Sequence, residues 1–246
     1  MDFNGIKLFL DTSDQLIKRI ISSVSEHKKS YFYALNPDCY LKFLDDYKYK
    51  EILQNEKNIV YVDGMGIIYT QKFLKLPVAK ERIATTDLFP QLLKELNQKK
   101  LGYRIFLLGG KGETGKRVIE RFKKEYPNVN FVGYHHGYFE EKDVADIISI
   151  VNNLEVDILF VGFGCPVQEK WVDDHSKELY NVKAFITCGG LFDYYSGNVK
   201  RAPLFMRKYG LEWLFRLIQE PKRLYKRYLF GNARYVTHMI GKKLGG

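Results

Sequence analysis

Short apolar runs alternate with longer amphipathic stretches along the first 199 residues. Each run is four or five residues long and contains aromatic or β-branched residues, as buried strands do. Most of these runs are followed directly by glycine, asparagine or aspartate, which favour turns. The expected strands are Tyr31–Leu35, Ile59–Val62, Arg104–Leu108, Asn130–Tyr134, Asp157–Val161 and Ala184–Thr187.

The stretches between the strands have apolar residues at helical spacing. The first begins after Asn36-Pro37, where Asn36 or Asp38 is expected to cap the helix. The other expected helices are Thr86–Leu96, Gly115–Tyr126, Lys142–Asn153 and Gln168–Leu179. Repeated strand–turn–helix order predicts an α/β fold with a mainly parallel sheet and helices on both faces.

The pattern changes near Lys200. Residues 1–199 contain 27 Lys and Arg and 27 Asp and Glu, whereas residues 200–246 contain 12 basic residues and only two acids, Glu212 and Glu220. The whole net charge of +10 therefore lies in the last 47 residues. We expect an α/β catalytic core at 1–199 and a basic, aromatic, helical appendage at 200–246 that binds something anionic.

The sequence gives no sign of secretion or of a membrane span. It has no apolar stretch of 18 or more residues, and Met1–Leu10 lacks the basic and apolar regions of a signal peptide. The three cysteines, Cys39, Cys165 and Cys188, have no CxxC spacing, so neither a disulfide framework nor a zinc site is expected. The aromatic residues among the cations of the appendage are typical of a helix at a membrane interface. A cytoplasmic protein, peripheral on the inner face of the membrane, is expected.

Polar residues or glycines follow most of the predicted strands. In an open parallel sheet, ligands bind beyond the carboxyl ends of the strands, so these residues predict one shared cleft. Glycines also begin ordinary loops, and a single pair would indicate nothing more. The strand-end residues are Asn36, Asp63-Gly64, Gly109-Gly110, Gly162, Gly164 and Gly189-Gly190.

Two of these strand ends suggest particular chemistry. Asp63 is a candidate general base, although an aspartate after a strand is by frequency more often a turn or capping residue. The glycine-rich stretch Gly109–Gly115 opens a helix and is suited to a phosphate, but it matches neither of the common nucleotide-binding motifs.

Taken together, the motifs resemble those of the bacterial WecG/TagA/CpsF glycosyltransferases (sequence family 26), in the same order along the chain from about residue 5 to 236. The stretch Gly162–Trp171 is similar to the GxGxPxQE signature of that family. The other motifs are Asn36-Pro37, Asp63–Gly66, Glu81-Arg82-Ile83 with Asp87-Leu88, Phe106–Gly110, Tyr126-Pro127, Gly137-Tyr138-Phe139, Gly189–Asp193, Gly197, Lys200–Pro203, Gly210–Trp213 and Glu220-Pro221.

The resemblance implies a Rossmann-like fold and an inverting transferase that needs neither metal nor cofactor. The implied donor is a UDP-sugar, often N-acetylmannosamine or its uronic acid, although a related hexose is also possible. The implied acceptor is a sugar on undecaprenyl diphosphate, in the synthesis of teichoic acid, capsule or exopolysaccharide. A homo-oligomer is plausible, and nucleic acid is not an expected partner.

The resemblance also assigns site residues. It places Asp63 at the catalytic base, Asn36, Arg82 and Gln168 in the pocket, and Arg216 and Arg223 on the donor diphosphate. Pro221 is expected to break or start a helix between the two arginines, so whether they share a face stays open. The remaining expected substrate-binding residues are Gly109, Gly110, Gly137, Tyr138 and Gly164.

The chain departs from the family pattern at two places. Ala34 stands two residues before Asn36, where many members have threonine, and Ala84-Thr85 replaces the Thr-Gly of RVTGxDL. Both changes alter the expected acceptor pocket and bear on which sugar is used.

Two other classes of protein fit parts of the sequence. The basic aromatic tail is compatible with nucleic-acid binding, which steeply salt-dependent affinity for oligonucleotides would support. The α/β pattern is compatible with a Rossmann-like oxidoreductase, but no GxGxxG follows the first strand.

Truncation near Lys200 is expected to leave a soluble, folded core with little transferase activity, because charge and aromatic character change there. Circular dichroism, vesicle sedimentation and a transfer assay measure the three properties. A truncated chain that keeps full activity and still binds vesicles would refute the role given to the appendage.

Overall fold

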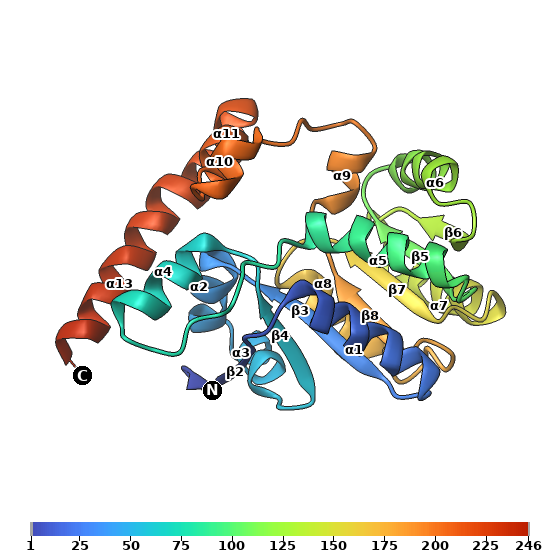
Figure 1. Cartoon of the computed structure of the whole chain (residues 1–246), viewed down its shortest axis with the longest axis horizontal. Helices are drawn as coiled ribbons and strands as arrows, with labels where there is room; N and C mark the ends of the chain where they lie inside the picture. The colour runs from blue at the N-terminus through green and yellow to red at the C-terminus, as the bar shows by residue number, and fades with distance from the viewer. Residues whose placement is uncertain (1, 246) are drawn as a thin grey trace.

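The computed structural model describes residues 2–245 and contains one twisted sheet (Figure 1). Its strand order within this range is β1-β2-β4-β3-β8-β7-β5-β6, with β1 antiparallel at the edge and the other pairs parallel. The predicted mainly parallel α/β sheet is therefore confirmed. The strands are β1 (Asp2–Phe3), β2 (Ile6–Phe9), β3 (Ser30–Leu35), β4 (Asn58–Val62), β5 (Arg104–Gly109), β6 (Asn130–His135), β7 (Ile158–Gly162) and β8 (Ala184–Thr187).

Helices cover both faces of the sheet, and α1 and α5 lie across the face seen in Figure 1. The helices of the core are α1 (Ser13–Ser25), α2 (Pro37–Asp45), α3 (Tyr47–Gln54), α4 (Met65–Phe73), α5 (Thr85–Lys99), α6 (Thr114–Glu125), α7 (Val144–Asn153), α8 (Val167–His175) and α9 (Leu191–Tyr195), with a 3₁₀ turn η1 at Glu141–Asp143. The C-terminal helices are α10 (Leu204–Lys208), α11 (Glu212–Gln219), α12 (Pro221–Tyr225) and α13 (Gly231–Gly245), with a π-helical turn η2 at Lys226–Phe230.

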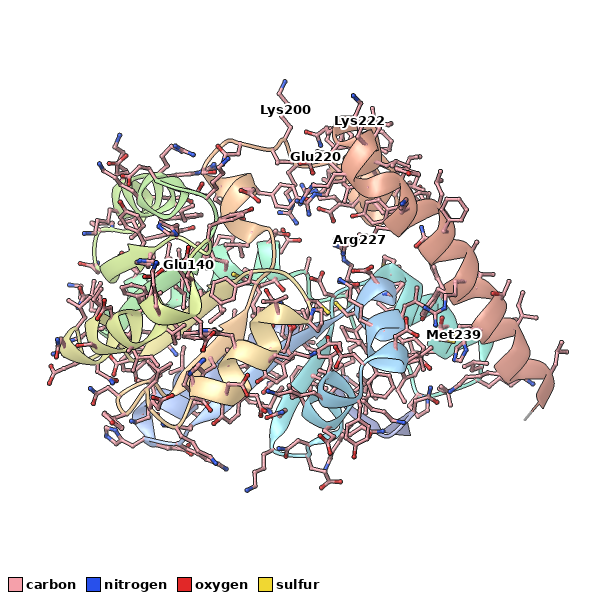
Figure 2. All side chains as sticks on the ribbon, turned by 180° about the vertical axis from the view of Figure 1, so that it is seen from behind. Glu140, Lys200, Glu220, Lys222, Arg227 and Met239 are labelled. Carbon is pink, nitrogen blue, oxygen red and sulfur yellow. The ribbon has the colours of Figure 1, made fainter. Side chains whose placement is uncertain are left out.

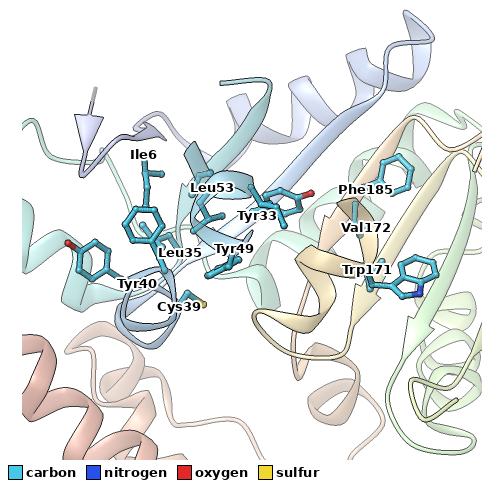
Figure 3. Close-up of a cluster of buried hydrophobic side chains, with 14 of the residues drawn as sticks. Ile6, Tyr33, Leu35, Cys39, Tyr40, Tyr49, Leu53, Trp171, Val172 and Phe185 are labelled. Carbon is cyan, nitrogen blue, oxygen red and sulfur yellow. The ribbon is translucent and has the colours of Figure 1, made fainter. Parts of the chain in front are cut away.

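The sheet separates two hydrophobic layers, because successive side chains of a strand point to opposite faces. Along β5, Ile105 and Leu107 join the layer under α1, α5, α6 and α9. Phe106 and Leu108 join the layer under α2, α3, α4, α7 and α8, part of which is drawn in Figure 3. Strands buried on both faces explain why the sequence shows continuous apolar runs rather than alternation.

All six predicted strands are present, and Asn36 is the N-cap of α2, since its Oδ1 accepts a hydrogen bond from the Cys39 amide at 3.0 Å. The prediction of helix to Leu179 was too long, because α8 ends at His175. The sequence pattern did not predict β1 and β2, because β1 has only two residues and Lys7 interrupts the apolar run of β2.

The C-terminal helices pack on the core rather than extending away from it. Tyr235 and Met239 of α13 are buried, and the Tyr235 hydroxyl lies 2.8 Å from that of Thr70 in α4. Arg234 makes a two-pronged ion pair with Asp45 at 2.5 and 2.6 Å. Figure 2 shows α13 along the flank of the core, with Met239 labelled. Truncation after residue 199 therefore uncovers apolar surface of the core, and the division into two parts stays a prediction.

Phe89 of α5 is the best single test of the core. It is fully buried and makes edge-to-face contacts with Phe122 and Phe160, at centroid distances of 5.2 and 4.9 Å. Phe89→Ala is expected to lower the free energy of unfolding by about 3–5 kcal/mol in urea denaturation, because a cavity replaces the ring. Tyr180→Ala is the control: this side chain is 69% exposed, and its loss is expected to change stability by less than about 0.5 kcal/mol.

Candidate active site

The strand order brings the predicted strand-end residues to one edge of the sheet. Across the middle of that edge lie, in spatial order, the ends of β4, β3, β8, β7 and β5. The chain continues from these ends with Asp63, Asn36, Cys188-Gly189, Phe163 and Gly110 respectively. Parallel strands put all these residues on the same side, where ligands of doubly wound sheets bind.

Asp63 sits where the ends of β3 and β4 meet. Its backbone amide donates to the carbonyl of Leu35 at 2.9 Å. The glycines that follow it pack on the turn after β3: a methyl group on Gly64 or Gly66 would lie 2.8 or 2.6 Å from the ring of Pro37. This close packing requires glycine at both positions and fixes Asp63 beside Asn36.

The Asp63 carboxylate is mostly shielded from water and has few partners. Its side chain is 23% exposed, an Arg82 terminal nitrogen lies 3.7 Å from it, and the Thr85 hydroxyl donates to it at 3.4 Å. Thr85, which stands where the family pattern has glycine, also lies 2.7 Å from the hydroxyl of Tyr61. Burial raises the pKa of Asp63 to about 6, against the opposing attraction of Arg82. A carboxylate with this pKa is a stronger base than a solvated one and is still ionised at neutral pH.

Arg82 links two parts of the site through hydrogen bonds. Its Nε donates to the backbone carbonyl of Asp63 at 2.7 Å, and a terminal nitrogen donates to Glu212 of α11 at 2.7 Å. The guanidinium therefore connects the loop of Asp63 to the C-terminal segment, residues 200–245. The structure gives Arg82 this bracing role, and its assignment as a substrate-binding residue remains a prediction.

Gln168 joins two loops of the edge. Its Oε1 accepts hydrogen bonds from the amides of Gly164 and Gly189 at 3.1 and 3.0 Å, and its Nε2 donates to Glu169 at 2.7 Å. Gln168 is buried, so its amide holds the loops after β7 and β8 together. Burial raises the pKa of the neighbouring Glu169. Contact between Gln168 and a substrate stays a prediction.

Glycines pack against one another along the other half of the edge. A methyl group on Gly109 would lie 2.5 Å from the carbonyl oxygen of Gly162, and one on Gly162 would lie 2.8 Å from that of Gly189. The amide of Gly137 donates to the carbonyl of Gly110 at 2.8 Å. These glycines therefore allow the loops to approach one another. By contrast, Gly164 has space around its α-carbon and a φ of 89°.

The structure places the remaining predicted residues at this edge or next to it. Tyr138 follows Gly137 and is 73% exposed. The terminal nitrogen of Arg216 lies 2.9 Å from where a methyl on Gly190 would be, and its guanidinium stacks 4.8 Å above the Tyr194 ring.

Arg216 and Arg223 both face one carboxylate. Arg216 Nε is 3.9 Å from Glu220, and Arg223 forms an ion pair with the same residue. The predicted break at Pro221 is confirmed, because α11 ends at Gln219 and α12 begins at Pro221. Arg223 is 60% exposed, so Arg216 is the inner of the two cations.

Further cations of the C-terminal segment meet acids of the core. Arg201 forms a two-pronged pair with Asp87 at 2.7 Å, and Arg227 lies 3.0 Å from Asp38 and points toward α2 (Figure 2). Four arginines have a buried Nε that lacks a hydrogen-bond partner within residues 2–245. They are Arg201, Arg207, Arg216 and Arg227.

Sequence reasoning missed the partners of these cations in the core, and it gave Glu212 no role. The available signal was composition: Glu212 and Glu220 are the only acids among the last 47 residues, and both pair with arginines at the site. As for metals, the part of the chain that the structure describes has no group of three or more His, Cys, Asp or Glu placed to hold an ion.

An α/β sheet with a largely shielded carboxylate and several arginines at its carboxyl edge is typical of a site that binds an anionic ligand. The model of the glycosyl transferase WecG/TagA/CpsF family matches residues 1–246. The chain belongs to this family and is a glycosyltransferase, as the sequence motifs predicted.

Several named relatives are similar to this chain over most of its length. The chain is 36% identical over 217 residues to a protein of Bacillus subtilis (strain 168), covering 88% of this chain and 77% of the relative. It is 32% identical over 218 residues to one of Bacillus spizizenii, covering 88% and 81%, and 28% identical over 228 residues to one of Staphylococcus aureus (strain MRSA252), covering 91% and 86%. All three are named N-acetylglucosaminyldiphosphoundecaprenol N-acetyl-beta-D-mannosaminyltransferase.

Because the pKa of Asp63 is raised in the folded protein, ionisation of this carboxyl is expected to lower the free energy of unfolding. The unfolded carboxyl ionises near 3.8 and the folded one near 6, so stability falls as pH rises through this window. Asp63→Asn is expected to stabilise the protein at pH 8, by up to about 3 kcal/mol in urea denaturation, and by less as the pH falls toward 4.

Asp87→Asn is the matched control. Arg201 holds the pKa of Asp87 below its usual value despite the partial burial of the carboxyl, so this substitution is expected to destabilise the protein at pH 8. Equal effects of the two substitutions, or a loss of stability on Asp63→Asn at pH 8, would contradict the environment assigned to Asp63.

Proposed function

We propose that the protein transfers N-acetylmannosamine, or a related hexose, from a UDP-sugar to a sugar on undecaprenyl diphosphate, with inversion and without a metal. The acceptor is proposed from the names of the relatives, which act on N-acetylglucosaminyldiphosphoundecaprenol. The products of this reaction serve teichoic acid or exopolysaccharide synthesis. The observation that carries the chemistry is the largely shielded Asp63 carboxylate beside a cluster of arginines at one sheet edge.

Asp63 is proposed as the general base. It removes the proton of the acceptor hydroxyl as that oxygen attacks the anomeric carbon, and the bond from that carbon to the diphosphate breaks with its electrons leaving on UDP. Attack opposite the leaving group inverts the anomeric centre. A β-linked product, as in the relatives' names, follows by inversion from a donor whose diphosphate is α-linked. The pKa near 6 suits this base at neutral pH.

Arginines are proposed to stabilise the leaving diphosphate. Arg216 lies against Gly190 at the end of β8, and Arg227 lies above Asp38 at the start of α2. Each has a buried Nε–H without a hydrogen-bond partner among the described residues, and an anion would satisfy such a donor. Guanidinium groups match phosphate oxygens in geometry and supply positive charge without a metal. Arg223, further out, is proposed to join them.

A membrane-facing surface is proposed on the C-terminal helices, since a polyprenyl carrier stays in the bilayer. No helix within residues 2–245 is long and apolar enough to cross a membrane. Large apolar side chains are nevertheless exposed there, close to cations such as Lys200 and Lys222, which point outward in Figure 2. This combination is typical of reversible interfacial binding. The exposed side chains are Leu204, Phe205, Tyr209, Leu211, Ile218, Tyr225, Leu229, Phe230, Val236, Ile240 and Leu244.

A transfer assay tests the proposal. The full chain is incubated with UDP-N-acetylmannosamine and a short-chain lipid-diphospho-N-acetylglucosamine, with and without EDTA, and then with a panel of other UDP-hexoses. Transfer to a β-linked disaccharide at an unchanged rate in EDTA is expected. Asp63→Asn is expected to lower kcat at least about 100-fold, because the general base is lost. Arg216→Gln is expected to raise KM for the donor and lower kcat.

The control is Lys142→Gln, a surface charge change in the turn before α7, which is expected to leave both constants unchanged. Failure of every UDP-sugar with a folded wild-type protein would refute the donor class. Transfer that survives Asp63→Asn undiminished would refute the base.

A further inference from the structure

The carboxylate of Glu212 lies at the centre of a buried cluster of charges between the core and the C-terminal segment. It accepts from Arg82 at 2.7 Å and lies 3.7 Å from Nε of Arg201. The side chains of all three are at least 79% shielded from solvent. Arg201 in turn holds Asp87 at the start of α5. Glu212 is thus the one acid that α11 contributes to the cluster, within the described residues.

Two carboxylates compete for Arg82. Its terminal nitrogen is 2.7 Å from Glu212 but 3.7 Å from Asp63, so the stronger ion pair is with Glu212. The Nε of Arg82 donates to the backbone carbonyl of Asp63. This hydrogen bond keeps the guanidinium from turning fully toward the carboxylate of Asp63. Arg82 therefore holds the loop of the base without making a close hydrogen-bonded pair with the base itself.

We propose that Glu212 is a positioning residue for the transfer reaction: by binding Arg82 it keeps this guanidinium off the Asp63 carboxylate, so that the base gains its full strength only when the C-terminal segment is docked. This inference rests on the proposed function of Asp63 as the base. A base paired closely with a guanidinium is weaker, since the pair favours its charged form. The docking of the C-terminal segment and the basicity of Asp63 are then linked through the side chain of Glu212.

The other groups around Asp63 are consistent with this balance. Burial raises the pKa of Asp63, Arg82 lowers it and the negative charge of Glu212 raises it. Thr85, at the start of α5, stabilises the charged form through its amide and its hydroxyl. Tyr61, within β4, is neutral, because burial raises its pKa well above the usual value. Arg82 and Glu212 are therefore the charged neighbours that set the strength of the base in opposite directions.

Two charge-removing substitutions in the full chain give opposite expected results. Glu212→Gln frees Arg82 to pair with Asp63, so the acidic midpoint of kcat/KM is expected to fall by about one pH unit and the plateau to fall several-fold. Arg82→Gln removes the cation that the two carboxylates share and leaves Glu212 only its longer pair with Arg201, so the midpoint is expected to rise, whatever the loss in plateau. The measurement is the transfer rate at low substrate concentration between pH 4.5 and 9, with folding of each variant checked by thermal unfolding.

Asp45→Asn is the control for docking alone. It removes the Arg234 ion pair on the far side of the C-terminal segment, so any loss of activity is expected at all pH values with an unmoved midpoint. An unmoved midpoint in Glu212→Gln, or a midpoint that falls in Arg82→Gln, overturns the inference. If Glu212→Gln is too slow for its pH profile to be measured, the direction of the midpoint shift in Arg82→Gln decides between the outcomes. A wild-type protein that transfers no sugar refutes the proposed function instead.

Discussion

The Asp63 carboxylate is held at the end of β4 with only a fraction of its surface in water, and much of the surrounding structure follows from this one constraint. A charge that loses its water needs fixed partners, yet a base that is paired too well no longer takes a proton. Arg82 meets both demands. Its Nε binds the backbone carbonyl of Asp63, and its terminal nitrogen binds the carboxylate of Glu212. Loops near β4, α5 and α11 all contribute to the balance.

The parallel sheet supplies the geometry for this arrangement. Since seven parallel strands end on one side, residues far apart in the sequence meet there without long connections. The core contributes glycine loops and the carboxylates of Asp38, Asp63 and Asp87, and the C-terminal segment contributes several arginines. Between Arg82 and Glu212 the roles are reversed, since the cation comes from the core and the acid from the segment. Asp38 and Asp87 of the core each receive an arginine from this segment. Part of the excess positive charge at the end of the sequence therefore lies against acids of the core, near the place where a diphosphate is proposed to bind.

The strands and their ends were predictable because each is encoded locally. An apolar run followed by a turn residue identifies β4 and Asp63 without any knowledge of the rest of the chain. The contacts that give the site its character are not local: Arg82 and Glu212 are 130 positions apart. The function of Gln168 was equally hidden, since a motif shows that a residue matters but not whether it touches a substrate or holds two loops together. Only the folded arrangement shows which donors and acceptors are already occupied.

Gly109 and Gly162, at the ends of β5 and β7, leave no room for side chains where they pack on the neighbouring glycine loops. A substitution at either position changes the spacing of the loops before it changes the chemistry. The opposite half of the edge is formed by the loops after β3 and β4, the start of α5 and the C-terminal segment, and it contains the side chains around Asp63. Ala34, Ala84 and Thr85, where this chain departs from the family pattern, all lie in that half. Side chains in the half around Asp63 can therefore differ without altering the glycine packing that sets the spacing of the loops.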